Sequence, residues 1–215
     1  MSSYRTIEGT SDAEVVEKKS RFIAQLAHVD DEEAALAFLQ SVRTEHAQAR
    51  HNVYAYVLRG GRVRYSDDGE PPQTSGLPTY ETLAHAELVD VICVTTRYFG
   101  GTLLGTGGLV RAYTQACQEA IAAAHVAVVS VCRDVSLSVP YDLYQAVLRA
   151  AEGPGVAVAS TDFAECVRLV FRALDEEAEG LKARLVEATR GKCPIDVGPT
   201  YEGAIGCVPT ARHAS

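Results

Sequence analysis

The chain has 215 residues and a mass of 23.0 kDa, of which 47% are hydrophobic and 22% charged, so it can form one large or two small hydrophobic cores. A net charge of −8 and a pI of about 5.3 argue against indiscriminate binding to a polyanion, which depends on releasing many counterions. No apolar stretch reaches the roughly 18 residues of a membrane span, and the polar start lacks a signal-peptide pattern. We therefore expect a cytoplasmic protein without membrane contact.

The first half alternates between strand and helix patterns. Apolar and polar residues alternate over 21–29, which predicts a strand. Residues 30–46 predict a helix, because Asp30 or Asp31 can cap it and acidic residues fill its first turn. Residues 52–70 are typical of a β-hairpin that turns at two consecutive glycines.

The glycine-rich part of the first half follows this hairpin. We expect a short helix after Pro78 and then a strand over 89–99, whose continuous apolar, β-branched run is typical of a strand covered on both faces. A helical pattern begins at Gly108. We assign residues 1–128 to this first domain.

The second half predicts the order βαββαβ, which is typical of a ferredoxin-like domain. We place this domain at residues 132–205, a boundary near 126–132 and a loose tail at 206–215. The expected elements are strand 133–140, helix 141–153, strand 155–161, strand 162–173, helix 175–191 and a final strand within 194–205.

The cysteines are scattered, with no CxxC pair and no histidine at metal-ligand spacing. We therefore expect reduced thiols, no metal site and no cofactor. The six residues are Cys93, Cys117, Cys132, Cys166, Cys193 and Cys207.

Residues 97–113, RYFGGTLLGTGGLVRAY, place five glycines between two arginines at the start of the last helix of the first half. Bare backbone at a helix N-terminus favours an anion, and arginines add charge-assisted hydrogen bonds. Tight turns and close packing are the alternative reason for these glycines. The predicted anion-binding residues are Arg97, Tyr98, Gly100, Gly101, Gly107, Gly108 and Arg111.

Further basic residues of the first half occur in short stretches interleaved with tyrosines, a pattern that suits stacking on nucleic-acid bases if the rings are exposed. We expect them to share one face with Arg97 and Arg111 and to form an RNA-binding patch. They are Lys18, Lys19, Arg21, Arg50, Arg62 and Arg64.

The stretch YSDDGEPPQTSGLP at 65–78 allows two interpretations. Its acidic residues Asp67, Asp68 and Glu70 could bind Mg²⁺ or act as a general base, and the same residues suit an exposed turn. His51 is either a hydrogen-bonded structural residue or a catalyst. Nothing in the spacing of serine, histidine and aspartate proposes a triad.

Four stretches resemble the IMPACT family, whose bacterial members are YigZ-like proteins. They are KKSRFIA (18–24), ARHNVYAY (49–56), DDGEP (67–71) and TRYFGGTLLGTGGLVRAY (96–113). The resemblance runs from about residue 15 to 205. It implies an α+β protein with two domains. The first is an α/β sandwich similar to ribosomal small-subunit proteins and to elongation factor G, with a left-handed βαβ crossover, and the second is ferredoxin-like.

The resemblance also marks a family-motif loop made of His51, Asp67, Asp68, Glu70 and Thr74. The family usually has Ser-Gly-Thr-Ala-Gly after DDGEP, whereas this chain has Pro72-Gln73-Thr74-Ser75-Gly76. This departure stiffens the loop and argues against a mobile, phosphate-binding role for it.

Eukaryotic members are similar to translational regulators that act through protein contacts, which implies a translation-linked role. Our first hypothesis is a non-enzymatic protein that contacts RNA, the ribosome or a ribosome-associated factor. A protein–protein adaptor without nucleic acid is one alternative. An enzyme acting on a phosphorylated small molecule or nucleotide is the other. The sequence leaves the partner and the oligomeric state open.

Overall fold

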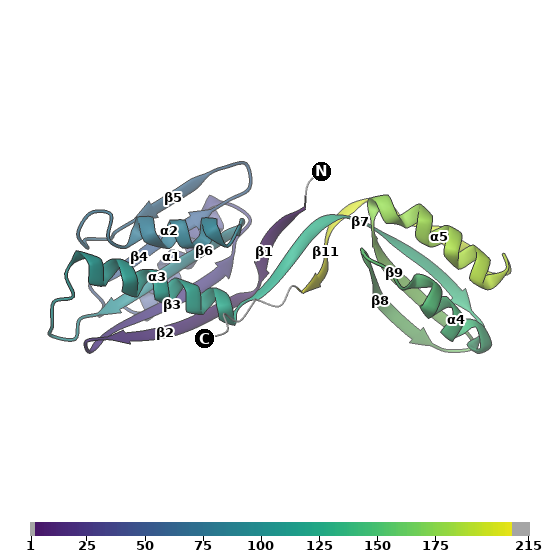
Figure 1. Ribbon diagram of the computed structural model, residues 1–215, viewed down its shortest axis with the longest axis horizontal. Helices are drawn as coiled ribbons and strands as arrows, with labels where there is room; N and C mark the ends of the chain where they lie inside the picture. Colours follow the sequence, from purple (N-terminus) through teal and green to yellow (C-terminus); the bar gives the residue numbers. More distant parts are fainter. Residues whose placement is uncertain (1–2, 208–215) are drawn as a thin grey trace. The chain divides into compact units, whose positions relative to one another are not determined.

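The computed structural model describes the backbone of residues 3–207 and the side chains of residues 3–204. Packing divides them into two units, Tyr4–Ala127 and Val128–Cys207, with the remaining described residue, Ser3, assigned to the second. Figure 1 labels the elements of both units. No helix among residues 3–207 is both long enough and apolar enough to span a bilayer.

The first unit is built on a five-stranded antiparallel sheet in the order β2-β3-β6-β4-β5. All five of its strands lie before residue 100, and β1 (Tyr4–Glu8) lies beside β3. The strands are β2 (Thr10–Glu17), β3 (Ser20–His28), β4 (His51–Val57), β5 (Val63–Ser66) and β6 (Val91–Tyr98), and the helices are α1 (Glu32–Glu45), α2 (Gly76–His85) and α3 (Thr106–Ala123).

Helices cover both faces of this sheet, with α2 and α3 on the near side in Figure 1 and α1 behind. Successive side chains of β4 point to opposite faces of the sheet, and both faces are apolar. Val53 and Ala55 pack in the core formed with α2 and α3, whereas Tyr54 and Tyr56 pack in the core formed with α1. Strand β6 is buried from Val91 to Arg97, which confirms the prediction of a strand covered on both faces.

The two helical crossovers of this sheet have opposite hands. Both β3-α1-β4 and β5-α2-β6 join parallel strands that have one strand between them. A rotation by half a turn within the plane of the sheet brings the β5-α2-β6 crossover onto the β3-α1-β4 crossover. The two crossovers would therefore have the same handedness if α1 and α2 lay on the same face of the sheet. Because they lie on opposite faces, one crossover is left-handed, an arrangement that is rare in sheets. The predicted left-handed crossover is confirmed.

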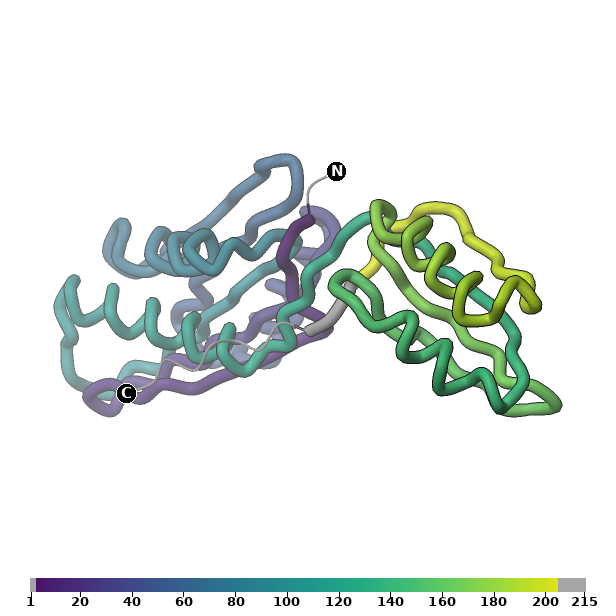
Figure 2. The backbone as a smooth tube through the Cα atoms, turned by 45° about the vertical axis from the view of Figure 1, so that its right-hand side comes forward, coloured from purple at the N-terminus to yellow at the C-terminus, as the bar shows by residue number. Residues whose placement is uncertain are grey.

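The second unit contains the four-stranded order β10-β7-β9-β8, with β11 also paired to β7. This order, with α4 and α5 packed against one another (Figure 2), is the ferredoxin-like arrangement. That prediction is confirmed. The elements are β7 (His125–Val139), α4 (Tyr141–Ala151), β8 (Val156–Phe163), β9 (Val167–Leu174), α5 (Asp175–Thr189), β10 (Ile195–Val197) and β11 (Tyr201–Cys207).

Some boundaries differ from the sequence-based expectation. The two units divide between Ala127 and Val128, within the expected range 126–132, but strand β7 continues through this range because HVAVVSVC contains no glycine or proline to interrupt it. Helix α2 begins before Pro78, which occupies its first turn, where a missing N–H costs nothing. Residues 162–163 belong to β8, and β9 begins only at Val167.

At the C-terminal end, strand β11 continues through Cys207, so the first two residues of the expected tail at 206–215 belong to a strand. The rest of that segment lies outside the described residues. The five cysteines whose side chains are described are free thiols. The side chain of Cys207 lies outside the described part.

We predict that the two units unfold as separate cores. Leu26 and Phe171 are both fully buried, one in each unit. Leu26→Ala and Phe171→Ala should each destabilise its own unit by about 2–5 kcal/mol, the usual cost of truncating a large core side chain. Differential scanning calorimetry should show one transition lowered by each variant. A shift of one common transition in both variants would contradict separate cores.

Candidate functional site

The four motif stretches meet at one end of the first unit's sheet. Arg97, near the end of β6, is paired with Phe22 of β3 on one side and with His51 of β4 on the other. The β2–β3 turn, Lys18-Lys19, lies against Gly100, where a Cβ atom would come within 2.0 Å of the Lys19 carbonyl carbon. Only glycine allows this approach.

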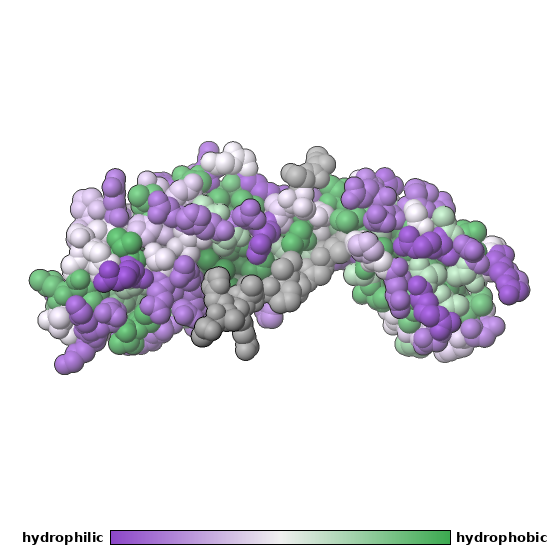
Figure 3. All heavy atoms as spheres, in the orientation of Figure 1, coloured by the Kyte–Doolittle hydropathy of each residue, from purple (hydrophilic) through white to green (hydrophobic). Residues whose placement is uncertain are grey.

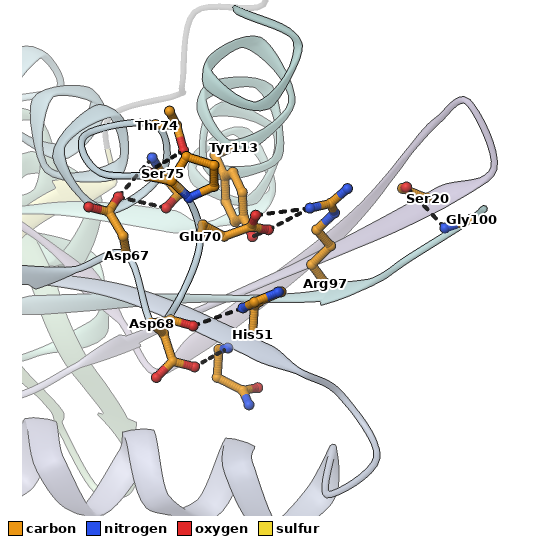
Figure 4. A network of polar contacts seen from close by, with 12 residues as sticks. Ser20, His51, Asp67, Asp68, Glu70, Thr74, Ser75, Arg97, Gly100 and Tyr113 are labelled. Atoms are coloured by element: carbon orange, nitrogen blue, oxygen red, sulfur yellow. Dashed lines mark hydrogen bonds and ion pairs between the residues drawn. The ribbon is translucent and has the colours of Figure 1, made fainter. Parts of the chain in front are cut away.

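A buried ion pair lies at the centre of this end. The Nη1 of Arg97 donates to both carboxylate oxygens of Glu70, at 2.7 and 3.0 Å, and the hydroxyl of Tyr113 donates to Glu70 Oε1 at 2.8 Å (Figure 4). The guanidinium lies 5.4 Å from the ring centre of Phe22 and 5.6 Å from that of Phe99. Burial, together with the charge of Glu70, raises the pKa of the Tyr113 hydroxyl far above its ordinary value.

Arg97 therefore differs from the exposed anion ligand that we expected. Its side chain is only 8% exposed and its charge is balanced by Glu70. Only Nη1 is used in this pair, and Nε is buried without a hydrogen-bond partner among the described residues. Such a donor is costly unless something accepts from it.

The carboxylates of the acidic loop 67–75 accept hydrogen bonds from the protein itself. Asp67 accepts from the backbone N–H groups of Gln73, Ser75 and Gly76 and from the Ser75 hydroxyl, and so caps α2. Partial burial raises the pKa of Asp67, but these hydrogen bonds outweigh it and leave the pKa below its ordinary value. Thr74 bonds within the same loop, donating to the Pro71 carbonyl at 2.7 Å.

Asp68 is also fully engaged, since its two carboxylate oxygens accept from Arg43 Nη2 and from the Asn52 backbone N–H. All six oxygens of Asp67, Asp68 and Glu70 thus accept hydrogen bonds from the protein. Within the part of the chain that the structure describes, no three candidate ligands gather as a metal site. This pattern favours the structural interpretation of the acidic stretch.

At Pro72-Gln73 the chain departs from the usual family sequence. The Asp67 cap of α2 is kept there, but the backbone is strained. Gln73 has a φ of 62°. Glycine adopts this backbone conformation without strain, whereas a residue with a side chain is strained in it. Its backbone N–H still donates to Asp67 at 2.9 Å. The backbone N–H groups of Gln73, Ser75 and Gly76 are therefore already bonded to Asp67 and not free for a phosphate.

A cleft of about 620 Å³ opens at the same end of the sheet, a size usual for small-molecule sites. Its lining contains two arginines and no carboxylate, and two of the lining residues are large and exposed, Phe99 at 55% and Leu103 at 84%. Figure 3 shows hydrophobic surface among hydrophilic surface at this end of the first unit. The lining residues are Gln48, Ala49, Arg50, His51, Arg97, Tyr98, Phe99 and Leu103.

Hydrogen bonds hold two of the lining side chains. His51 Nδ1 lies 2.8 Å from the backbone carbonyl oxygen of Asp68, so it must be the protonated nitrogen. The Tyr98 hydroxyl lies 3.0 Å from His46 Nδ1, and the guanidinium of Arg21 lies 5.7 Å from the Tyr98 ring centre. His51 is thus the hydrogen-bonded residue of our first interpretation, and it also faces the cleft.

The expectation of a single basic face is wrong. Arg62 and Arg64 pair with Glu32 of α1, at 2.7 and 3.5 Å, and Arg64 lies opposite Tyr56, away from the His51 end of β4. A hydrogen bond from Tyr56, helped by the charges of these arginines, lowers the pKa of Glu32. These two cations therefore lie on the α1 face, far along the strands from Arg97.

Arg21 is also paired, through two hydrogen bonds to Glu14 at 2.7 and 2.9 Å. Four of the predicted cations are exposed and have no ion pair within residues 3–204: Lys18, Lys19, Arg50 and Arg111. Of these four, Arg50 lines the cleft. Both lysines of the turn have positive φ, 47° and 68°, a strained conformation for side-chain-bearing residues.

The N-terminus of α3 keeps the features that suggested an anion. It has no acidic residue in its first turn and no side-chain cap, and its N-cap is Gly105. Arg111 Nη1 would lie 3.6 Å from a Cβ atom at Gly107, so its guanidinium reaches back over the helix start. Gly101 supplies a turn with φ 87°, and Gly108 packs against Leu104. An anion site here stays a prediction.

Sequence reasoning missed three important residues. Phe99 and Leu103 were visible as large apolar residues inside a glycine-rich loop, which is a signal for exposed binding surface. Tyr113 matched the buried face of a helix, and nothing in its spacing reveals that its hydroxyl meets Glu70.

Comparison with known proteins agrees with the motif resemblance. Residues 18–121 match the Impact N-terminal domain, and residues 137–192 match a domain of unknown function, DUF1949. The IMPACT family member YvyE of Bacillus subtilis is 33% identical over 200 residues, which cover 91% of each chain. This chain belongs to the IMPACT family.

Two further relatives agree with this assignment. The IMPACT family member YigZ of Escherichia coli is 47% identical over 108 residues, covering 48% of this chain and 53% of YigZ. A crystal structure of a hypothetical protein, 31% identical, aligns with a TM-score of 0.59 over 91% of this chain and 97% of that one.

We predict that Arg97 is needed for folding and that Arg111 is not. Arg97→Ala leaves Glu70 buried without its counter-charge, which typically costs about 3–5 kcal/mol. Arg111→Ala removes an exposed cation and should change the unfolding free energy by less than about 0.5 kcal/mol. Urea denaturation of both variants measures the difference. Equal, small effects would contradict the buried ion pair.

Asp67 should make the first unit sensitive to acid. Its pKa is lower in the folded state than in the unfolded state. The Asp67 carboxylate therefore adds to the unfolding free energy above an ordinary aspartate pKa of about 4, and this stabilisation is lost as the pH falls through the lower folded-state pKa. Asp67→Asn should reduce the unfolding free energy near pH 7 by about 1–2 kcal/mol.

The difference between this variant and the unmodified protein should shrink below pH 4 in denaturation experiments. Asp12→Asn is the matched control, since Asp12 is exposed and has no side-chain partner within the described residues. A difference that is independent of pH would contradict the capping role of the carboxylate.

Proposed function

We propose that this cytoplasmic protein is a translation-linked regulator that acts by binding, without catalysis, and contacts RNA, the ribosome or a ribosome-associated factor. The binding surface is the end of the first unit that carries the cleft. The proposal rests on the convergence there of the four stretches that mark the IMPACT family, together with a cleft lining that has no carboxylate.

Charge supports an anionic partner. The chain as a whole carries −8, yet Arg50 in the cleft and the turn Lys18-Lys19 beside Gly100 have no ion pair within residues 3–204. Cations left unpaired on an acidic chain favour a local contact with phosphate over general binding to polyanions.

An enzymatic role has less support. The three acidic residues that could supply acid–base chemistry are bonded to the loop, to Asn52 and Arg43, or to Arg97. The exposed Phe99 and Leu103 favour a second candidate, a protein–protein adaptor, because apolar side chains of this size commonly serve protein contacts.

Sedimentation through a sucrose gradient tests the proposal. The protein in a lysate of its own cells should migrate with ribosomal particles, and nuclease treatment should return it to the top. Arg50→Ala should weaken the association, whereas Arg64→Ala, which changes a cation paired with Glu32, should not.

The other outcomes each decide between the candidates. Migration with ribosomal particles that survives nuclease would favour contact with a ribosome-associated protein over contact with RNA. Migration at the top in every sample would overturn the proposed link to the ribosome.

A further inference from the structure

The exposed ring in the cleft lining is a platform for a planar group. Phe99 is 55% exposed although it lies in the lining of a cleft, and the guanidinium of Arg97 lies 5.6 Å from its ring centre. The ring is therefore supported by the ion pair beneath it while more than half of its surface stays accessible. Aromatic rings held in this way are the surfaces on which single-stranded bases stack.

The same lining offers donors to an anion. Arg50 is exposed and has no ion pair among the described residues, and no carboxylate lines the cleft to compete for it. Arg97 is more than nine-tenths buried, lines the cleft and uses only Nη1 for Glu70. A planar guanidinium fork suits a phosphate, which accepts two hydrogen bonds at once.

One lining residue provides an acceptor. Because Nδ1 of His51 donates to the Asp68 carbonyl oxygen, the neutral ring carries its lone pair on Nε2. An acceptor beside two guanidinium groups suits a hydroxyl, and the 2′-hydroxyl is the group that distinguishes RNA from DNA.

We propose that this cleft binds one unstacked nucleotide of single-stranded RNA, with its base against Phe99, its phosphate at Arg50 and its 2′-hydroxyl at His51. This inference rests on the proposed function and names the ligand of that site. A cleft of about 620 Å³ accepts a single nucleotide, and a duplex keeps its bases stacked and unavailable. An acidic peptide would use the cations but would gain nothing from the aromatic face.

Fluorescence anisotropy with a ten-nucleotide RNA of alternating cytidine and adenosine tests the proposal, because this sequence does not pair with itself. Phe99→Ala should weaken binding by about 5- to 100-fold, the effect of removing one stacking aromatic. Phe163→Ala is the matched control, since Phe163 is 61% exposed on the second unit, and it should leave the affinity unchanged.

Arg50→Ala should weaken binding and reduce the slope of log affinity against log salt by about 1, the contribution of one phosphate contact. The control variant Arg64→Ala should have the same slope as the unmodified protein. The DNA of the same sequence and the RNA duplex with its complement should both bind several-fold more weakly than the single strand. Thermal unfolding of each variant checks that it is folded.

Three results would overturn the inference: equal affinities of the Phe99→Ala and Phe163→Ala variants, equal affinities for RNA and DNA, or a labelled hexaglutamate peptide binding as tightly as the RNA. Any of these with the protein still migrating with ribosomal particles would reject the nucleotide cleft and leave the proposed function standing. Tight RNA binding without such migration would support the cleft and reject the ribosomal association.

Discussion

The first unit depends on the burial of the Arg97–Glu70 ion pair. Removing two charges from water costs several kcal/mol per ion, and the cost is recovered only where the geometry is good and the remaining oxygens are satisfied. Both carboxylate oxygens accept from Arg97, and Tyr113 adds a further donor. The pair thereby ties β6 to the acidic loop and to α3, so the cleft is held by a contact that tolerates little displacement.

The acidic loop transmits this constraint to the neighbouring elements. Within a few residues of Glu70, Asp68 holds the start of β4 through the Asn52 backbone N–H, and Asp67 caps α2. His51 in turn donates to the Asp68 carbonyl oxygen. The loop whose acidic residues could have bound Mg²⁺ or acted in catalysis therefore positions one wall of the cleft, and its carboxylates act through the residues that they hold.

Local patterns made most of the fold predictable, whereas the site depended on pairings across the sheet. Local patterns identified α1, with Asp30 or Asp31 as its cap, and the βαββαβ order of the second unit, because those signals lie within one element. The cap is Asp31. The partner of Arg97 is 27 residues away and that of Arg62 is 30 away. Which acid each arginine meets depends on how the strands that carry or adjoin the arginines pack against α1, which carries Glu32, and against the acidic loop, which carries Glu70. A cluster of cations in sequence therefore gave no information on which charges remain unpaired.

Net charge is a poor guide to what the cleft can bind. At physiological ionic strength charges more than about 8 Å apart are largely screened, so acids elsewhere on the chain contribute little to the potential at Arg50. Of the two lining arginines, Arg97 is balanced by Glu70, and Arg50 has no counter-charge among the side chains of residues 3–204. One uncompensated cation provides a weak, salt-sensitive attraction. Affinity for a nucleotide must therefore come chiefly from the ring of Phe99, and that is why substitution of this aromatic is expected to weaken binding more than substitution of any single cation.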